Sequence, residues 1–417
     1  MPESIPSPPS AGALLRRRGY MLFWISRVAS TVGVQIQSVG LGWVVYTVAR
    51  QALGVKESAL YVGLIGLAAF IPVLLLTLPA GEIADRHDRR KILLICYAGE
   101  IATAAFLACA VFFDFATLTL LLAVSALFGS CRAFMAPAST ALGPMLVTRE
   151  LLPRAIAWNS LAFQGGAIIG PAIGGVILAV SPTAAFATSA ALYLTAAIVV
   201  TLIGDNTRPT VNAGSRWDLM KEGLAYVWTN KIVFGAISLD LFAVLLGGAT
   251  ALLPVFARDV LHAGPEGFGI LRAGPAAGAA TVAVLLAVYP IRRHAGVIMF
   301  AGVAVFGAAT IVFGLSKWLP LSVGALAVLG AADMLSVYVR QTLMQIVTPD
   351  QMRGRVASVS FLFIGASNEL GEFESGVAAR FLGPVGAALF GGVGALIVTG
   401  VWARLFPALR RADRLDN

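Results

Sequence analysis

Twelve long runs of mostly apolar residues dominate this 417-residue chain and leave little room for any other organisation. A helix needs roughly 20 mostly apolar residues to cross the hydrocarbon core of a bilayer. Only 12% of the residues are charged, whereas soluble domains carry roughly 25%. The sequence therefore predicts an all-α integral membrane protein with twelve transmembrane helices, near residues 21–49, 58–80, 91–113, 116–146, 155–179, 183–203, 232–256, 266–289, 295–314, 318–346, 355–381 and 384–405.

The charged residues and cysteines exclude two classes of function. The net charge of +9 does not indicate nucleic-acid binding, because the basic residues form short clusters between apolar runs rather than one continuous face. Cys96, Cys109 and Cys131 lie inside apolar runs without metal-ligand spacing. We interpret them as buried thiols and expect neither a metal site nor a disulfide framework.

The sequence lacks the residues that a haem or metal enzyme or an ATP-driven pump requires. His87, His262 and His294 fall in or beside loops, away from the middle of a span, where haem or metal chemistry would need them. The sequence contains no G-x-x-x-x-G-K-[ST] loop, which ATP-driven pumps use to hold phosphates. We therefore expect a chain that is not an enzyme and has no cofactor.

The basic residues predict the orientation of the spans. Cytoplasmic loops of membrane proteins are enriched in Lys and Arg. With the N-terminus in the cytoplasm, most of the 30 Lys and Arg residues fall on the inner side, and the outer loops receive only Arg50, Lys56, Arg258, Lys317 and Arg380. Both termini are therefore expected in the cytoplasm of a cell whose inner membrane holds the chain.

The longest connection, residues 204–231, divides the chain into halves. Within it Trp217, Met220, Leu224 and Val227 recur at helical spacing, which fits a helix on the inner leaflet and equally an ordinary cytosolic linker helix. The other predicted segments are a cytoplasmic N-terminal segment, two bundles of six helices and a cytoplasmic tail, at residues 1–20, 21–203, 232–405 and 406–417.

The two halves repeat each other. A shift of 200 residues aligns Val147-Thr148 with Val347-Thr348, Ala157 with Ala357, Ser160 with Ser360, Phe163 with Phe363 and Gly165 with Gly365. A run of matches that includes the same loop in each half indicates an internal duplication. Parallel repeats of six spans are one way to build an alternating-access transporter.

A charged loop between the second and third runs carries the first family signature. It reads Gly81-Glu82-Ile83-Ala84-Asp85-Arg86-His87-Asp88-Arg89-Arg90-Lys91 and resembles the major facilitator loop G-x-L-A-D-R-x-G-R-R/K, with Ile83 and Asp88 as departures. Gly81 permits a tight turn. Asp85 could hold the N-terminal end of a neighbouring helix through its dipole, and Arg86, Arg89 and Arg90 would anchor the loop at the inner face.

The fifth run carries a second signature. Gly166-Ala167-Ile168-Ile169-Gly170-Pro171-Ala172-Ile173-Gly174-Gly175 resembles the antiporter motif of drug exporters, G-x-x-x-G-P-x-x-G-G. Gly166 and Gly170 lie one turn apart, so a second helix can pack against bare backbone there. Pro171 removes one backbone donor and permits a bend. On residues alone this is a hinge and a packing seam, and the resemblance is what connects it to export.

These resemblances imply a secondary active transporter of the major facilitator superfamily, built as two pseudo-symmetric bundles. Residues 368–376 and 406–411 are similar to the bacterial drug and siderophore exporter branch that includes the enterobactin exporter. The branch implies a monomer that exports a small amphiphilic molecule, such as a drug or siderophore, in exchange for protons. The alternative is an importer or a lipid or metabolite carrier on the same fold.

Ionisable residues inside the spans point to the transport pathway, because each costs at least ~2.5–3.5 kcal/mol at bilayer depth. In this family the first, fourth, seventh and tenth spans line the cavity. The resemblance therefore makes Arg27, Gln35, Gln37, Arg132 and Arg340 substrate-cavity candidates.

The carboxylates of the spans are candidates for proton coupling, namely Glu372, Asp333, Glu369 and Asp240. Glu369 and Glu372 are one helical turn apart, whereas Glu374 points about 200° around the helix from Glu372. All three therefore cannot face one cavity. Two close carboxylates in a medium of low dielectric favour a protonated form, so Glu372 is the preferred proton carrier, with Asp333 as its competitor.

Overall fold

The computed structural model describes residues 14–205, 207, 216–291 and 293–412, and every regular element among them is helical. The predicted segments 1–20, 204–231 and 406–417 lie partly outside these residues. The first half contains α1 (Arg18–Ala52), α2 (Val55–Arg86), α3 (Arg89–Phe112), α4 (Leu118–Met145), η1 (Arg149–Leu151), α5 (Leu152–Val180) and α6 (Pro182–Thr201). The helix α7 (Arg216–Thr229) follows, and the second half contains α8 (Lys231–Leu246), η2 (Ala249–Leu252), α9 (Leu253–Val255), η3 (Phe256–Val260), α10 (Gly264–Val288), α11 (Ala295–Leu315), α12 (Leu319–Val347), α13 (Asp350–Leu405) and α14 (Pro407–Arg410).

The predicted number of spans is confirmed. Eleven described helical segments are long and apolar enough to cross a membrane. The last of them is two helices joined at Gly383, whose φ of 78° lies in the left-handed region that glycine adopts without a Cβ penalty. Its first limb covers residues 350–382 and its second limb residues 384–405. The chain is therefore a multi-pass membrane protein with twelve spans.

The seventh span is not continuous. Helix α8 ends at Leu246, and the chain then passes through Gly247 and Gly248 into η2, α9 and the π-helical η3. Gly248 lies so close to the first limb of α13 that a Cβ on it would be 2.3 Å from the Gly371 carbonyl oxygen. The backbone break is thus covered by protein, which is where irregular backbone is tolerated at membrane depth.

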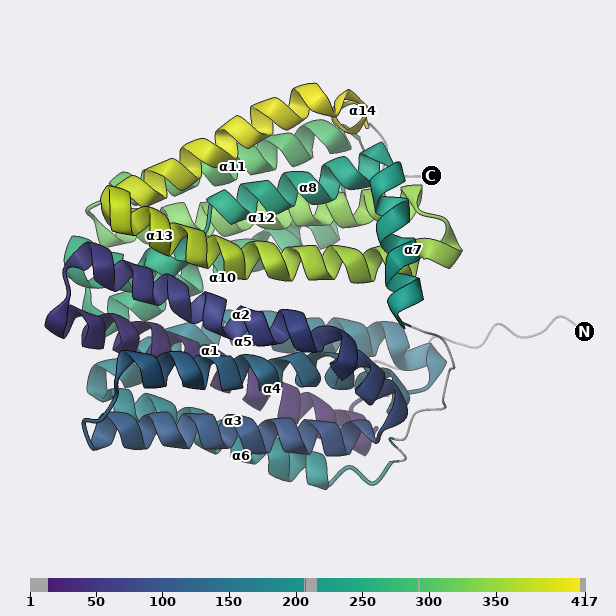
Figure 1. The fold of residues 1–417 in the computed structure, drawn as a ribbon. Coiled ribbons are helices and arrows are strands. Elements are labelled where there is room, and N and C mark those ends of the chain that lie inside the picture. Colours follow the sequence, from purple (N-terminus) through teal and green to yellow (C-terminus); the bar gives the residue numbers. More distant parts are fainter. Residues whose placement is uncertain (1–13, 206, 208–215, 292, 413–417) are drawn as a thin grey trace, which may run out of the picture.

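Two bundles of six spans lie side by side (Figure 1). The same kind of close backbone contact at a glycine joins helices in both halves. A Cβ on Gly129 of α4 would be 2.1 Å from the Ala69 carbonyl oxygen of α2, and one on Gly330 of α12 would be 1.9 Å from that of Pro275 on α10. Close backbone approach at small residues is how helices associate in lipid, and its repetition in equivalent spans gives the bundles their pseudo-symmetry.

The linker helix α7 packs on the second half near the start of α13. Arg355 pairs with Glu222, and the Tyr226 hydroxyl donates a hydrogen bond of 3.0 Å to the Val347 carbonyl oxygen. Val227 is buried, while Trp228 is largely exposed. One face of α7 therefore contacts protein. Helices α7 and α14 and the start of α1 mark one end of the bundle, which we call the terminal face, and the turn between the two limbs of α13 lies at the opposite face (Figure 1).

Candidate functional site

A cavity of about 170 Å³ lies between the two halves. It is lined from the first half by α1, α2 and α4, and from the second half by the broken seventh span, α10 and the first limb of α13. Apolar side chains such as Ile65, Phe128 and Phe268 form much of the wall. Its polar lining residues are Gln35, Ser38, Ser125, Arg132, Thr250, Arg272, Glu369 and Glu372.

Opposite charges from the two halves meet in this cavity. Nη1 of Arg132, on α4, lies 3.7 Å from Oε1 of Glu369, on α13. The Arg132 guanidinium also lies 5.9 Å from the ring centroid of Phe128, within the range of a cation–π contact. The cavity therefore contains a cation fixed to one bundle and carboxylates fixed to the other, so a movement of the bundles changes their separation.

Glu372 reaches the cavity because α2 carries no side chain beside it. A Cβ on Gly66 would be 3.0 Å from Oε2 of Glu372, and a Cβ on Gly63 would be 2.9 Å from the Cα of Gly376. These glycines, one turn apart, bring α2 and the first limb of α13 into contact. The contact places Glu372 at the seam between the halves.

The other predicted carboxylates gather elsewhere. Asp240 of α8 pairs with Arg340 of α12, and both side chains are almost fully buried. Asp333 interacts electrostatically with both. These three residues are absent from the cavity lining, so they form a separate charged cluster inside the second half.

The remaining substrate candidates lie in the first half. Gln35 lines the cavity, but Gln37 is fully buried. Arg27 donates a hydrogen bond of 3.4 Å to Oδ1 of Asn159 on α5. The fully buried Glu100 of α3 interacts electrostatically with Arg132 and Arg27, so the cavity arginine also experiences the charge of a carboxylate outside the cavity lining.

The glycines of the antiporter motif contact two other helices. Added Cβ atoms on Gly166, Gly170 and Gly174 would lie 2.6, 2.6 and 3.2 Å from atoms of α1. A Cβ on Gly175 would lie 2.7 Å from the Cα of Gly269 on α10, in the other half. Helix α5, which also contains Pro171, thus packs along α1 and touches the second half near the opposite face.

Residues 81–91 connect helix ends at the terminal face, but only residues 87–88 lie between helices, because residues 81–86 end α2 and residues 89–91 begin α3. The tight turn expected at Gly81 is therefore wrong, since Gly81 lies within a helix. Arg89 donates to the Ala141 carbonyl oxygen near the end of α4, and Arg90 donates to that of Ile203 beyond α6. Cations are favourable at helix C-termini because of the helix dipole. Arg86 pairs with Glu82 within α2, Gly81 is buried and Asp85 is half-buried.

Asp88, where the family signature has glycine, caps the N-terminus of α3. Its Oδ1 accepts hydrogen bonds from the Arg90 backbone N–H at 3.0 Å and from the Thr207 hydroxyl at 2.5 Å. Partial burial acts to raise the pKa of Asp88. The hydrogen bonds from Thr207 and from the Arg90 and Lys91 backbone outweigh burial, so the pKa is lowered.

At the opposite face, the two halves are joined by polar contacts. The Tyr46 hydroxyl donates a hydrogen bond of 2.5 Å to Oδ2 of Asp259, and Nη2 of Arg50 lies 3.4 Å from Oδ1 of the same residue. Tyr46 and Arg50 end the first span, and Asp259 ends the seventh. Sequence reasoning missed these contacts and Arg272. Arg272 is a charge within the predicted span 266–289. The periodicity of one span does not show which residues of the other half it meets, so neither the place of Arg272 nor the contacts of Asp259 could be read from it.

Comparisons with known proteins agree with this architecture. The sequence profile of a family described as "Transmembrane secretion effector" matches residues 9–417. The chain is 28% identical over 253 residues to the staphyloferrin A transporter of Staphylococcus aureus, a match that covers 60% of this chain and 62% of that relative. It is 26% identical to the multidrug efflux pump Tap of Mycobacterium tuberculosis, covering 76% and 78% of the two chains.

A solved structure shows the same fold at low sequence identity. The bacterial homologue of the human lysosomal transporter Spinster, in an inward-facing and unoccupied conformation, superposes with a TM-score of 0.71 at 14% identity. The match covers 95% of this chain and 96% of that one. The two bundles around a central cavity are therefore arranged as in a known transporter.

Proposed function

Because the chain belongs to the transmembrane secretion effector family of the major facilitator superfamily, we propose that it exports a small amphiphilic molecule in exchange for protons. The protein works as a monomer in the bacterial inner membrane, with the terminal face in the cytoplasm. The observation that carries this proposal is the cavity between the halves, where Arg132 faces Glu369 and Glu372 lies close by. The efflux role of the Tap relative supports the direction of transport.

The cavity charges supply a way to couple substrate and proton. A proton on Glu369 removes the attraction of its carboxylate to Arg132, which weakens a contact between the bundles. A cationic or hydrogen-bond-donating group of the substrate binds the same carboxylate only when that proton is absent. Substrate and proton therefore compete for the same cluster, which is the physical requirement of antiport.

Glu372 is the preferred proton carrier because of its location. It lines the cavity and lies against Gly66 of the other half, so alternation of the bundles changes its surroundings. Asp333 has its charged neighbours within its own half. A group that stays inside one rigid bundle experiences less change as the halves move.

The two signatures act at the two ends of the pathway in this proposal. Residues 81–91 hold the helix ends together at the terminal face. Gly170 and Gly175 allow α5 to pack closely against α1 and α10 near the opposite face. Alternating access then consists of opening one end while the contacts at the other end hold.

The alternative, an importer or a lipid or metabolite carrier, predicts a different direction of movement. We would reconstitute the protein in vesicles with an imposed pH difference and add amphiphiles of different charge, including tetraphenylphosphonium and an alkyl sulfate. Export by antiport requires that a transported compound moves against the proton flow, and that a protonophore abolishes its accumulation. Movement of compound and protons in the same direction, or no movement of any compound, would contradict the proposal.

A further inference from the structure

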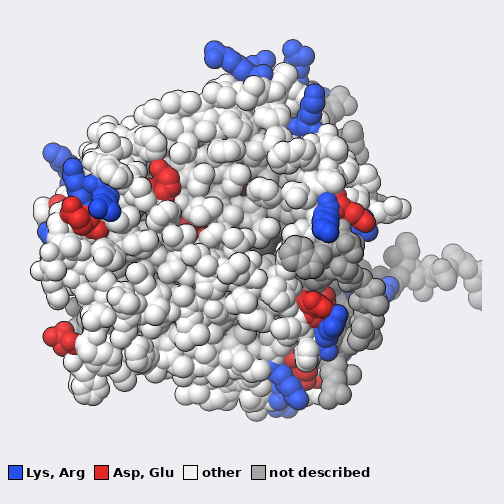
Figure 2. Space-filling view, viewed as in Figure 1, with Lys and Arg blue, Asp and Glu red and all other residues white. Residues whose placement is uncertain are grey.

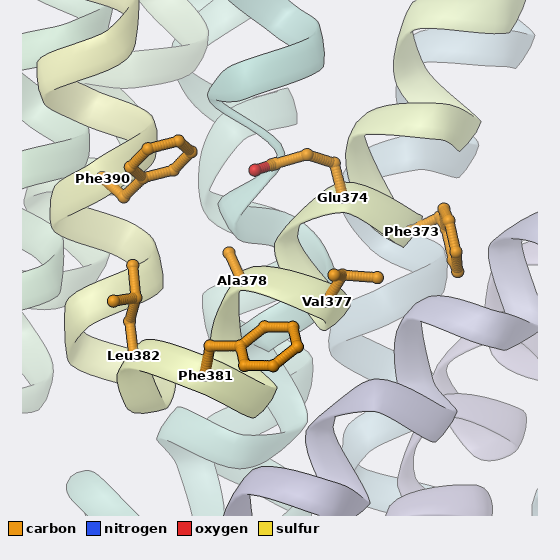
Figure 3. A pocket seen from close by; sticks show the side chains of 7 residues that line it. All are labelled: Phe373, Glu374, Val377, Ala378, Phe381, Leu382 and Phe390. Atoms are coloured by element: carbon orange, nitrogen blue, oxygen red, sulfur yellow. The ribbon is translucent and has the colours of Figure 1, made fainter.

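A second cavity lies outside the central pathway, on the lateral surface of the second half. Its volume is about 480 Å³, and it is lined by Phe373, Glu374, Val377, Ala378, Phe381, Leu382 and Phe390. These residues come from both limbs of α13. We call this cavity the α13 groove. Figure 3 shows the Glu374 carboxylate pointing from the first limb toward the second limb, on which Phe390 lies.

The α13 groove faces the region that lipid occupies. Phe381 is 71% exposed and Phe390 is 47% exposed, and in Figure 2 most of the lateral surface is uncharged, with the charged side chains gathered mainly toward the two ends of the molecule. Glu374 stands nine residues before the turn at Gly383, which is about 13 Å along a helix. A carboxylate at that depth is costly, and such residues normally face a bundle interior or a partner. Its place in an apolar groove therefore needs an explanation.

The protein supplies no cation to Glu374 among the described residues. None of the ion pairs there involves it. Arg380, six residues further along the same limb, lies about 240° around the helix and so points elsewhere. A bound cation from outside the protein would neutralise the charge of this carboxylate.

A helix end between the two limbs of α13 adds negative potential. The last turn of α8 lies between the two limbs of α13. A Cβ on Gly371 of the first limb would be 2.8 Å from the Val244 carbonyl oxygen, and one on Gly391 of the second limb would be 2.3 Å from that of Leu246. The C-terminal end of a helix carries partial negative charge, and aromatic faces also attract cations. Carboxylate, helix end and phenylalanine rings all favour the same kind of ligand.

We propose that the α13 groove binds the ammonium head of a cationic amphiphile dissolved in the bilayer, with Glu374 as its counter-ion. The occupant is a transported molecule rather than a structural lipid. A lipid amine is attached to a phosphate at the interface, and it could reach Glu374 only by drawing that phosphate about 13 Å into hydrocarbon. The assignment rests on the proposed function, because it gives the exported amphiphile a site of access from the membrane.

The break in the seventh span places this groove next to the central pathway. A Cβ on Gly248 would meet Gly371 and Ser375 of the first limb, and Thr250, two residues later, lines the central cavity. The first limb of α13, together with the broken segment, separates the two. An amphiphile in the groove is thus one helix away from Glu372.

The test uses a photoreactive alkyl-trimethylammonium probe and the full chain in phosphatidylglycerol vesicles. We expect the probe to label peptides that contain Phe381 and Phe390, and a non-reactive alkyl-trimethylammonium to compete where an alkyl sulfate of equal length does not. Glu374→Gln should reduce labelling about tenfold, the size expected for losing one charged contact, and Glu374→Asp should retain part of it. Glu57→Gln, at the exposed start of α2, is the matched control and should label like the wild type.

Two results would overturn the assignment. Labelling that is unchanged in Glu374→Gln, or competed equally by the alkyl sulfate, would show that no charge is recognised. Loss of labelling when phosphatidylethanolamine replaces phosphatidylglycerol would identify a lipid amine as the occupant. If Glu374→Gln does not fold, the alkyl sulfate competition in the wild type tests whether charge is recognised, and Phe390→Leu tests whether the probe occupies the groove.

The labelling needs no proton gradient, which separates this inference from the proposed function. Charge-dependent labelling without any proton-coupled transport would leave the groove assigned and refute the antiport proposal. Proton-coupled transport with labelling independent of Glu374 would support the antiport proposal and refute the groove assignment.

Discussion

Arg132 on α4 and Glu369 on α13 form an ion pair of 3.7 Å that joins the two halves within the membrane. The two side chains are 42% and 24% exposed to the cavity. Their partners on either side differ, since Arg132 is also close to Glu100, while Glu369 has Glu372 one turn away. Each member of the pair can therefore exchange this contact for an interaction with another charged group.

The first prediction concerns this exchange. Arg132→Gln and Glu369→Gln should each abolish substrate-driven proton release, because each removes one member of the coupled cluster. An ion pair this accessible contributes about 0–1 kcal/mol to stability, so thermal unfolding in detergent should change little. Arg132→Lys keeps the charge and is the control for folding. Normal proton release in Glu369→Gln would remove this residue from the coupling mechanism.

The second prediction separates the two proposed proton carriers. Glu372→Gln should eliminate the proton flux that accompanies substrate while substrate binding remains measurable. Asp333→Asn should spare the flux, because Asp333 belongs to the cluster with Asp240 and Arg340. Proton movement in proteoliposomes and binding by isothermal titration give the two readouts. If Glu372→Gln still moves protons with substrate, Asp333 becomes the preferred carrier.

The third prediction concerns Asp88. Loss of an N-cap carboxylate costs about 1 kcal/mol, so Asp88→Ala should lower the unfolding temperature, and Asp88→Asn should have a smaller effect. Because the folded-state pKa of Asp88 is lowered, its stabilisation is present above pH ~4, the usual value for Asp. It is lost as the pH falls through the folded-state pKa.

The measurement is the difference in stability between wild type and Asp88→Asn across this acidic range. It should shrink as the pH decreases. Asp114→Asn, in the turn after α3, is the control and should show no comparable trend. A difference that is constant with pH would mean that the Asp88 hydrogen bonds do not favour its charged form.

The fourth prediction concerns the contact at the opposite face. Asp259→Asn and Tyr46→Phe should weaken the link between the first and seventh spans and increase the population with that face open. Spin labels at the exposed positions Gln51 and His262, in a background without native cysteines, would report the separation. We expect longer distances in both variants and no change in Asp114→Asn. Unchanged distances would show that the face is held by helix packing alone.

The sequence predicts the number of spans well because a bilayer demands about 20 apolar residues for each. It also separates the carboxylates of the eleventh span correctly, since a rotation of 100° per residue follows from helix geometry. Glu369 and Glu372 line the central cavity, and Glu374 lies in the α13 groove.

Other features depend on contacts between distant segments. The break at Gly247 and Gly248 lies within the run predicted as residues 232–256, where neither the glycine pair nor Pro254 by itself distinguishes a break from a continuous span. It exists because Gly371 and Gly391 let α13 approach the end of α8 closely. The segregation of Asp333 from the cavity likewise requires the position of Asp240 on another helix. Periodicity describes one helix at a time and contains no information on its neighbours.

The last prediction tests the packing seam of the antiporter motif with two glycines of α5, five residues apart. A Cβ on Gly170 would be 2.6 Å from the Gln35 Cβ of α1, whereas one on Gly165 would meet nothing within 4 Å. Gly170→Leu and Gly165→Leu both replace a helix glycine, so they gain the same intrinsic helix propensity of about 0.8–1 kcal/mol. The difference between them therefore reports the contact alone.

Overpacking costs about 1–3 kcal/mol in a well-packed interior. We expect Gly170→Leu to insert into the membrane but to lose transport and unfold at a lower temperature than Gly165→Leu, which should transport like the wild type. Gly170→Ala should fall between them, because its single methyl group already requires α1 to move. Equal transport in the two leucine variants would show that α5 and α1 do not need close contact at Gly170 during the cycle.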